Sequence, residues 1–185
     1  LPGVTSFSLS MYSPLEGDNW GECVIQQGHA SPSHDTPCGS TWDRVSTHFL
    51  ESIGVPILRG RNFTEQDTAA SPQVAVVNEA FVKRFYPNQD PIGQHFGIDD
   101  PKYSGSFQIV GVFKDFKINV PYRDVRPVFL RPLAQRFMGY KEPEMISTET
   151  ESMMMNAMIV GFNSPQQDVE SLIRHTLAGI DPNLT

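Results

Sequence analysis

Glycine and proline interrupt this sequence so often that long regular elements are excluded from most of it. The 185 residues include 14 glycines and 15 prolines, and both residue types favour turns and end helices and strands. The longest apolar run, Ile109–Phe113, is far shorter than the roughly 20 residues that a membrane-spanning helix needs. The chain is therefore expected to be soluble and to fold from short elements, as one domain or two small lobes.

The charge balance excludes one class of partner. Apolar residues make up 39% of the chain, enough to build a core, and the net charge is −7. Nucleic-acid binding needs faces rich in Lys and Arg that neutralise phosphates, and the sequence has no such stretch. We expect no nucleic-acid partner, and an anionic membrane surface is an equally poor one.

Short apolar and β-branched segments bounded by turn residues predict strands. These segments are 1–12, 22–27, 57–63, 73–77, 107–113, 125–130 and 156–162. Pro127 predicts an edge strand or an irregular entry to the strand, because proline cannot donate to a sheet. Residues 28–42 are expected to form a loop, and residues 138–152 a polar, mobile segment.

Capping residues predict three helices. Ser46 begins a helix that ends at Ile53, and Gly54 is expected to take the left-handed conformation just beyond it. Asn78 begins a second helix, which Pro87 ends. The third begins at Ser164-Pro165-Gln166-Gln167 and ends before Asp181-Pro182.

Cys23 and Cys38 bracket a loop-like stretch and are expected to form a disulfide in an oxidising compartment. The bond would close a loop of about 15 residues, worth about 3 kcal/mol in the chain-entropy model. Two free thiols remain an alternative. So does a zinc site formed with His29 and His34, although the spacing matches no compact zinc motif.

The sequence has no glycine-rich phosphate loop and no nucleophile elbow, so we expect no catalytic residues and no cofactor. The remaining polar or sulfur-containing residues are interpreted structurally. His48 and His95 have no evident carboxylate partner, and His175 is expected on the solvated side of the last helix. The acidic cluster Glu16, Asp18 and Glu22 and the acidic pair Asp99 and Asp100 are interpreted as solvated loop charge. Met153–Met155 and Met158 could bind copper(I), but apolar packing is the preferred interpretation.

A turn after the first predicted helix contains Gly60, Arg61 and Asp67, preceded by Arg59. Two arginines near one carboxylate predict a structural turn fixed by charge-assisted hydrogen bonds. A site for an anionic ligand is the alternative.

Several segments together resemble the MacB-like periplasmic core domain of the MacB/FtsX class of ABC-transporter permeases, and in particular the large permeases of soil bacteria. The resemblance covers most of 45–135 and 156–185 in order, whereas 13–42 and 136–155 match poorly. The matching segments are Val45–Pro56, Leu58–Phe63 with Asp67, Val74–Phe81, Phe85–Pro87 with Asp90–Gly93, Ile109–Val112 with Asp115, Val128–Gln135, and Ile180–Leu184.

The resemblance implies an α+β fold in which a mixed-sheet porter-like lobe with packed helices carries a smaller inserted α/β lobe. We divide the chain into 1–69 and 119–185 for the porter-like lobe and 70–118 for the inserted lobe. Such a domain is non-catalytic, lies on the periplasmic side of the inner membrane, and transmits conformational change while docking a partner or substrate during export.

The same resemblance implies the partners. These are the flanking transmembrane helices of the parent permease, a second permease copy, an ATPase subunit on the cytoplasmic side, and a periplasmic partner protein. Since the chain begins with Leu1, we expect it to be a piece of a larger protein. The alternatives are a free-standing extracytoplasmic ligand-binding protein and a metal-binding or hydrolytic secreted domain that uses the Cys23–Cys38 loop.

Overall fold

The computed structural model describes residues 3–14, 20–33, 37–117, 124–163 and 168–183. Strands and helices alternate in an α+β fold with a mixed sheet, as predicted. The elements are β1 Val4–Ser10, β2 Trp20–Gln26, β3 Gly39–Val45, α1 Phe49–Ser52, β4 Ile57–Gly60, β5 Val74–Asn78, α2 Glu79–Phe85, β6 His95–Ile98, the 3-10 turn η1 Pro101–Tyr103, β7 Phe107–Phe113, β8 Val128–Pro132, α3 Pro143–Glu151, β9 Ala157–Phe162 and α4 Val169–Ile180. No helix in these ranges is both long and apolar enough to cross a membrane.

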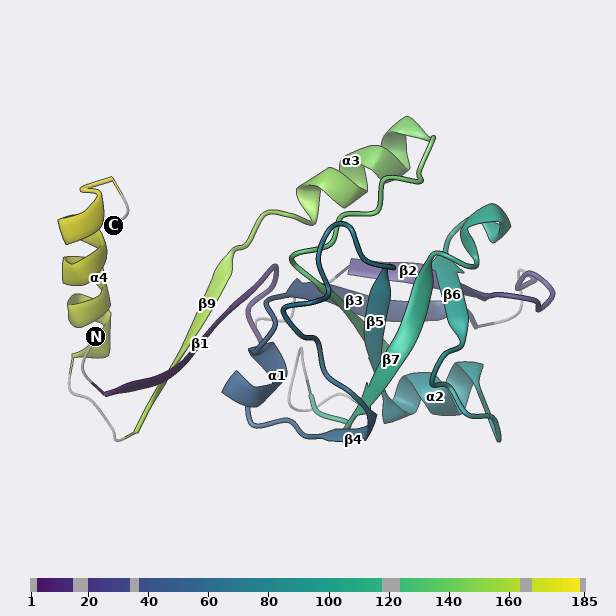
Figure 1. Ribbon diagram of the computed structural model, residues 1–185, viewed down its shortest axis with the longest axis horizontal. Coiled ribbons are helices and arrows are strands. Elements are labelled where there is room, and N and C mark those ends of the chain that lie inside the picture. Colours follow the sequence, from purple (N-terminus) through teal and green to yellow (C-terminus); the bar gives the residue numbers. More distant parts are fainter. Residues whose placement is uncertain (1–2, 15–19, 34–36, 118–123, 164–167, 184–185) are drawn as a thin grey trace.

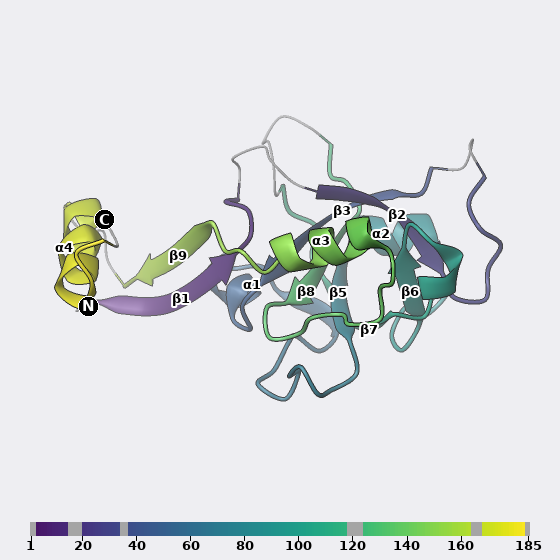
Figure 2. The same ribbon diagram turned by 90° about the horizontal axis from the view of Figure 1, so that it is seen from above.

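Across the described ranges the strands form one nine-stranded sheet. Its order is β2-β6-β7-β5-β8-β3-β1-β9, with β4 beside β7. The pairs β3–β8 and β5–β7 are parallel. Because β2 also pairs with β3, six strands close into a ring. Figures 1 and 2 show the resulting body, from which β1 and β9 extend as a two-stranded arm towards α4.

The strands of the segment predicted as an inserted lobe are integrated into this sheet. Within 70–118, β5 pairs with β8 and β6 pairs with β2. Strand β7 of the same segment pairs with β4. The division into two lobes stays a prediction, and backbone hydrogen bonds join the two parts at three places.

Aromatic side chains fill the body of the molecule. Phe96 contacts Phe129 with ring centroids 5.1 Å apart in an edge-to-face arrangement, and Phe81 of α2 lies 5.2 Å from Phe96. All three side chains are fully buried. Burial of one such side chain contributes roughly 1.5–3 kcal/mol, so this cluster fixes α2 against the sheet.

Asn78 caps α2, as the sequence predicts, and also joins that helix to the sheet. Its Oδ1 accepts from the backbone N–H of Phe81 at 2.9 Å and from that of Val128 at 2.8 Å. Its side-chain amide donates to the carbonyl of Arg126 at 2.8 Å. One buried amide therefore satisfies backbone groups at the start of α2 and at the entry to β8.

The sequence analysis was wrong for 39–42, which it assigned to a loop. These residues begin β3, in which Ser40, Thr41, Asp43 and Arg44 are all buried. The strand pairs with β2 on one side and β8 on the other. Polar residues can thus lie in a central strand, because groups elsewhere in the chain form hydrogen bonds with their side chains.

Two further local predictions need correction. Ser46 does not cap α1 with its side chain, because its hydroxyl accepts instead from the N–H of Leu9 at 2.9 Å. The strand after Pro127 is not at an edge but central, between β5 and β3, whereas Pro127 does lie at its entry, just before Val128. Pro127 precedes that strand and contributes only its carbonyl, which accepts from Thr41 N at 3.0 Å, so its missing N–H costs nothing there.

Other helix ends follow the predictions where the structure describes them. Gly54 has φ +71° just beyond α1. Helix α4 ends at Ile180, and the segment predicted to begin it, 164–167, lies outside the described residues.

The turn after β4 contains a bidentate ion pair. Arg61 donates to both carboxylate oxygens of Asp67, at 2.7 and 2.8 Å, and Thr64 N donates to the same carboxylate at 2.8 Å. These bonds hold the pKa of Asp67 below its ordinary value although burial alone would raise it. With both carboxylate oxygens occupied by Arg61, the contacts favour a structural role for the turn.

Strand β4 crosses β7 so closely that glycine is required on both sides. Gly60 has φ +69°, and a Cβ there would clash with the carbonyl oxygen of Val110. A Cβ on Gly111 would clash with the carbonyl oxygen of Arg61. The two clashing atoms belong to the backbone, so no side-chain rotation can relieve the overlap.

Gly111→Ala is accordingly expected to lower the free energy of unfolding by about 1–3 kcal/mol, since β4 must move away from β7. Urea unfolding followed by circular dichroism measures the change. Gly179→Ala in α4 is the matched control, because a Cβ there meets nothing within 4 Å. An unchanged midpoint for Gly111→Ala would contradict the close approach.

Candidate functional site

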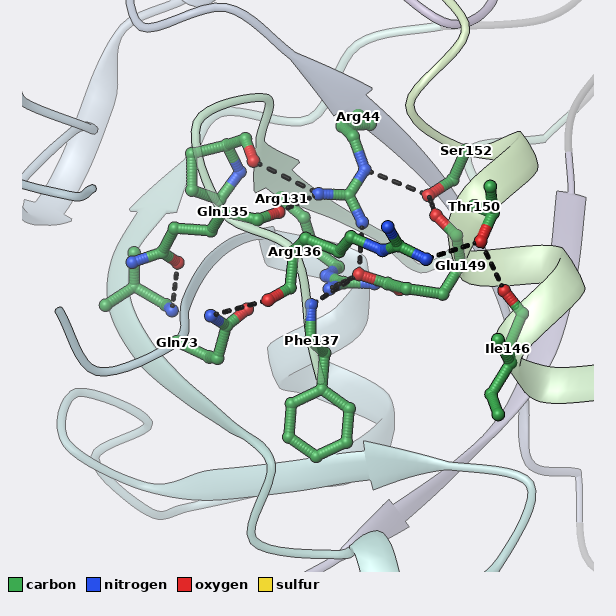
Figure 3. A network of polar contacts seen from close by, with 12 residues as sticks. Arg44, Gln73, Arg131, Gln135, Arg136, Phe137, Ile146, Glu149, Thr150 and Ser152 are labelled. Atoms are coloured by element: carbon green, nitrogen blue, oxygen red, sulfur yellow. Dashed lines mark hydrogen bonds and ion pairs between the residues drawn. The ribbon is translucent and has the colours of Figure 1, made fainter. Parts of the chain in front are cut away.

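Three buried charged side chains meet between the sheet and α3. Arg44 of β3 donates from Nη2 to Oε1 of Glu149 at 2.9 Å. Arg131 of β8 donates to both oxygens of the same carboxylate, at 2.7 and 2.9 Å. The exposed fractions of Arg44, Arg131 and Glu149 are 0%, 1% and 3%. Figure 3 shows Glu149 reaching from α3 to these guanidinium groups.

One carboxylate therefore compensates two cations. Burial by itself raises the pKa of Glu149, but the charges and hydrogen bonds of Arg131 and Arg44 outweigh it and keep that pKa below its ordinary value. The same burial, together with the charge of Arg131, lowers the pKa of Arg44 to about 9. At neutral pH Glu149 is therefore a carboxylate and Arg44 a guanidinium cation, and each depends on the other for its charge compensation.

Arg44 and Gln135 extend this centre into the neighbouring loop. The Arg44 guanidinium also donates to Ser152 Oγ at 3.0 Å and to the carbonyl of Gln135. The Gln135 side chain accepts from Val74 N at 2.9 Å and donates to Ser71 Oγ at 2.8 Å. The ends of α3, the loop after β8 and the entry to β5 are thus fixed to one another (Figure 3).

This arrangement corrects the sequence analysis of residues 138–152, which predicted a polar, mobile segment. They contain α3, which begins with Pro143 at its first turn and buries Glu149. Pro143 and the acidic Glu144 after it are signals that could have indicated a helix start. No local sequence pattern indicates that Glu149 is buried, because its partners Arg131 and Arg44 lie 18 and 105 residues away in sequence.

The arm joins the body beside this centre. The carboxylate of Asp43 in β3 accepts from the N–H groups of Met11 at 3.1 Å and Arg44 at 2.7 Å. Burial raises the pKa of Asp43 to about 7, although these bonds lower it. On the other strand of the arm, Asn156 N donates to the carbonyl of Ser10 at 3.2 Å, a few residues after α3 ends. Both strands of the arm therefore leave the body next to Arg44.

A pocket of about 330 Å³ lies between α3 and the sheet. Its lining combines aromatic and apolar side chains with carboxylates. The lining residues used below are Glu22, Trp42, Ile98, Asp99, Tyr140, Met145 and Glu149. The volume is at the lower end of the range of small-molecule sites.

Glu22 and Asp99 bring two carboxylates together in this pocket. Burial, and then the hydrogen bond and negative charge of Asp99, raise the pKa of Glu22 to about 8. Asp99 also accepts from Cys23 N at 3.1 Å. The interpretation of Glu22 as solvated charge was therefore wrong, because its sequence neighbours do not reveal that Asp99 faces it.

The other acidic residues considered from the sequence do not belong to this pocket pair. Asp100 forms an ion pair with Lys102 at 2.9 Å on the surface. Residues 16 and 18 lie outside the described residues.

Cys23 and Cys38 are joined by a disulfide with Cα atoms 4.8 Å apart. The bond links the middle of β2 to the segment entering β3, next to Asp99. His29 is exposed, and residue 34 lies outside the described residues. Within the described ranges no three His, Cys, Asp or Glu side chains form a group that could hold a metal ion.

The remaining residues singled out from the sequence lie away from this pocket. His48 is exposed, 3.9 Å from Glu51, and His175 is exposed on α4. Met153–Met155 follow α3, and Met158 lies in β9 against α4. The sequence reasoning missed Arg44, Arg131 and Glu149 altogether.

Glu149→Gln is expected to lower the free energy of unfolding by about 3–5 kcal/mol, because it leaves two buried cations without a counter-charge. Chemical unfolding at pH 7 measures this. Glu170→Gln is the matched control: it removes an exposed pair with Arg174, worth at most about 0.5 kcal/mol. Equal effects of the two substitutions would contradict the account of the buried centre.

The raised pKa of Glu22 predicts that the stability of the protein depends on pH. Its folded pKa of about 8 lies above the ordinary value of 4.5, so the stability it contributes is fully present below pH 4.5 and is lost as the pH rises towards 8. Glu22→Gln removes this loss, because the amide does not ionise. Urea midpoints should be similar to wild type at pH 4 and higher than wild type at pH 9.

The exposed Glu65→Gln serves as the control for this titration, since its side chain is 84% exposed. It should shift the midpoint little and equally at both pH values. A Glu22→Gln effect of the same size at pH 4 and pH 9 would show that Glu22 does not titrate as described.

Comparison with known proteins places this architecture in a family. A family model described as MacB-like periplasmic core domain matches residues 22–171. The pyoverdine export ATP-binding/permease protein PvdT of Pseudomonas aeruginosa is 27% identical over 131 residues, which are 69% of this chain and 18% of PvdT. The chain thus spans less than a fifth of that relative's length.

Two solved structures share the fold. The periplasmic region of MacB from Actinobacillus actinomycetemcomitans superimposes with a TM-score of 0.63 at 15% identity, covering 97% of this chain and 69% of that one. The extracellular domain of the noncanonic ABC-type transporter YknZ from Gram-positive bacteria gives 0.60 at 12% identity, covering 98% and 78%. Since the family model spans most of the sheet and α3, this chain belongs to the MacB-like periplasmic core domain family, the extracytoplasmic domains of ABC-transporter permeases.

Proposed function

We propose that this domain works in the inner membrane as the periplasmic part of an export permease, where it transmits conformational change and docks a partner or substrate without catalysing a reaction. ATP hydrolysis would take place on a cytoplasmic ATPase subunit or domain. A second permease copy and a periplasmic partner protein complete the proposed assembly.

The observation that carries this proposal is the arm. Strands β1 and β9 pair antiparallel from Val4 opposite Phe162 at the outer end to Ser10 opposite Ala157 at the inner end. Backbone hydrogen bonds along this length hold the two strands side by side, so a pull on their outer ends is carried to the body by both backbones together. In the proposed permease the membrane helices continue from the outer end of this arm (Figures 1 and 2).

The inner end of the arm is attached at the buried charged centre. Strand β1 continues into Met11, which donates to Asp43, and β9 follows closely on α3, whose Ser152 accepts from Arg44. Asp43 and Arg44 are adjacent in one central strand. A displacement of the arm would therefore move β3 and α3 together, and with them the pocket beneath α3.

An insertion experiment in the full-length permease tests this transmission. A Gly-Ser-Gly-Ser insertion after Met154 separates α3 from β9, and the matched control places the same insertion after Gly28 in the loop between β2 and β3. An Ile146→Cys label on the exposed side of α3 and an acceptor lipid in the outer leaflet report movement of the body, in a permease otherwise cleared of free cysteines.

Addition of ATP should change the energy transfer in the parent and in the Gly28 insertion. The insertion after Met154 should reduce the change, because only the β1 attachment to β3 then remains, while membrane insertion of the protein and ATP hydrolysis stay unchanged. A full response in the Met154 insertion would overturn the proposal that force passes through the arm.

A further inference from the structure

Two polar groups of the pocket beneath α3 are buried without a partner. The exposed fractions of Trp42 and Tyr140 are 2% and 5%. Among the described residues neither Trp42 Nε1 nor Tyr140 Oη has a hydrogen-bonding partner. Both side chains line the pocket that also holds Glu22 and Asp99. Leaving such a group unpaired is unfavourable, and a ligand that accepts a hydrogen bond from it recovers that cost.

These two groups and the two carboxyl groups line one pocket. The indole of Trp42 lies near enough to Glu22 to lower the pKa of that carboxyl, although burial raises it more and the two are not in hydrogen-bonding geometry. Burial raises the pKa of the Tyr140 phenol, and the negative charges of Glu149, Asp99 and Glu22 raise it further. The pocket thus combines two carboxyl groups, which accept hydrogen bonds, with two unpaired donors.

We propose that this pocket binds an organic cation in which an ammonium or guanidinium group is joined by a short apolar chain to an amide or hydroxyl oxygen. The cation lies between the carboxylates of Glu22 and Asp99. The oxygen accepts from Trp42 Nε1 and Tyr140 Oη. The apolar chain lies against Ile98 and Met145, which line the same pocket. A free amine or a lysine side chain in a partner peptide offers this chemistry.

The arrangement of charge supports a cation there. Burial raises the pKa of Glu22, and the hydrogen bond and negative charge of Asp99 raise it further, to about 8, so Glu22 holds a proton at neutral pH. A ligand cation can replace the proton and make charge-assisted hydrogen bonds to both groups. Glu149 also lines the pocket, but its charge is compensated by Arg44 and Arg131.

The remaining charged group facing this space is Glu144 of α3, which adds further negative charge. A bare metal ion fits less well, because no three ligating side chains of the described residues come together. The unpaired indole and phenol donors also call for an oxygen that a metal ion does not supply.

The probe is N-acetyl-lysinamide, which carries one ammonium group and two amide oxygens, titrated into the 185-residue chain by calorimetry at pH 8.5. N-acetyl-norleucinamide, which has the same shape without the charge, should not bind. Glu22→Gln and Asp99→Asn should each weaken binding about tenfold, the loss expected for one charge-assisted hydrogen bond. Asp99 has φ +61°, a conformation that Asn tolerates, so this second variant preserves the loop.

Tyr140→Phe tests the oxygen-accepting half of the site. The substitution should weaken the binding of N-acetyl-lysinamide but leave the binding of pentylamine, which has no oxygen, unchanged. Affinity for the lysine probe should rise between pH 6 and pH 9, with proton release at the lower pH, because the cation displaces the proton on Glu22. A lysine-containing tripeptide that binds tighter than the monomer identifies a peptide source, and equal affinity identifies a free amine.

Glu65→Gln, on the exposed surface, is the control and should leave affinity unchanged. Absence of binding at 20 mM probe, equal binding of the norleucine analogue, or unchanged affinity in Glu22→Gln and Asp99→Asn would each overturn the proposal. The titration uses the isolated chain, so its failure leaves the proposed transmission of movement untouched, and failure of the insertion experiment leaves this site untouched.

Discussion

Two guanidinium groups share one buried carboxylate, and the positions of α3, the arm and the pocket all depend on that contact. Arg44 comes from β3, Arg131 from β8 and Glu149 from α3, so the centre joins three elements that are distant in sequence. Such a centre adds little net stability compared with an apolar replacement, because burying charge is costly. The centre instead fixes the position of α3, since Glu149 can contact both arginines in only one position of that helix.

The same centre connects the parts that the proposed function requires. Asp43, next to Arg44 in the chain, holds the start of the segment leading from β1. Ser152 ties the end of α3 to Arg44 just before β9 begins. The pocket lies under the same helix, and Glu149 contributes to its lining. A movement of the arm and an occupant of the pocket would therefore act on one helix, which gives the two proposals a common physical element.

Local sequence patterns predicted those parts of the fold that are decided locally. The β-branched run Val74–Val77 and the alternating run Phe107–Phe113 are strands, and Asn78 caps the helix between them. The strand β3 could not be predicted in this way, because its polar residues are acceptable only with partners from the arm, β8 and α3. A strand from Gly39 to Val45 looks like a loop until those partners are in place.

The candidate site was less predictable than the fold for the same reason. Glu22 and Asp99 are 77 positions apart by residue number, and only the pairing of β2 with β6 brings them together. Glu149 lies in a polar segment without apolar periodicity. Gly111 and Gln135 fall in segments that resemble the permease family, and the structure gives each a role, through the crossing of β4 and through the bonds to Val74 and Ser71.

The central claim is that α3 and the sheet move as one body under load from the arm. The most direct measurement is a spin-label distance between Ile146→Cys on α3 and Glu65→Cys in the loop after β4, in the full-length permease with and without bound ATP. The account predicts one narrow distance distribution that is the same in both states. A second distance, or a shift on ATP binding, would contradict it, because α3 would then be moving independently of the buried charged centre.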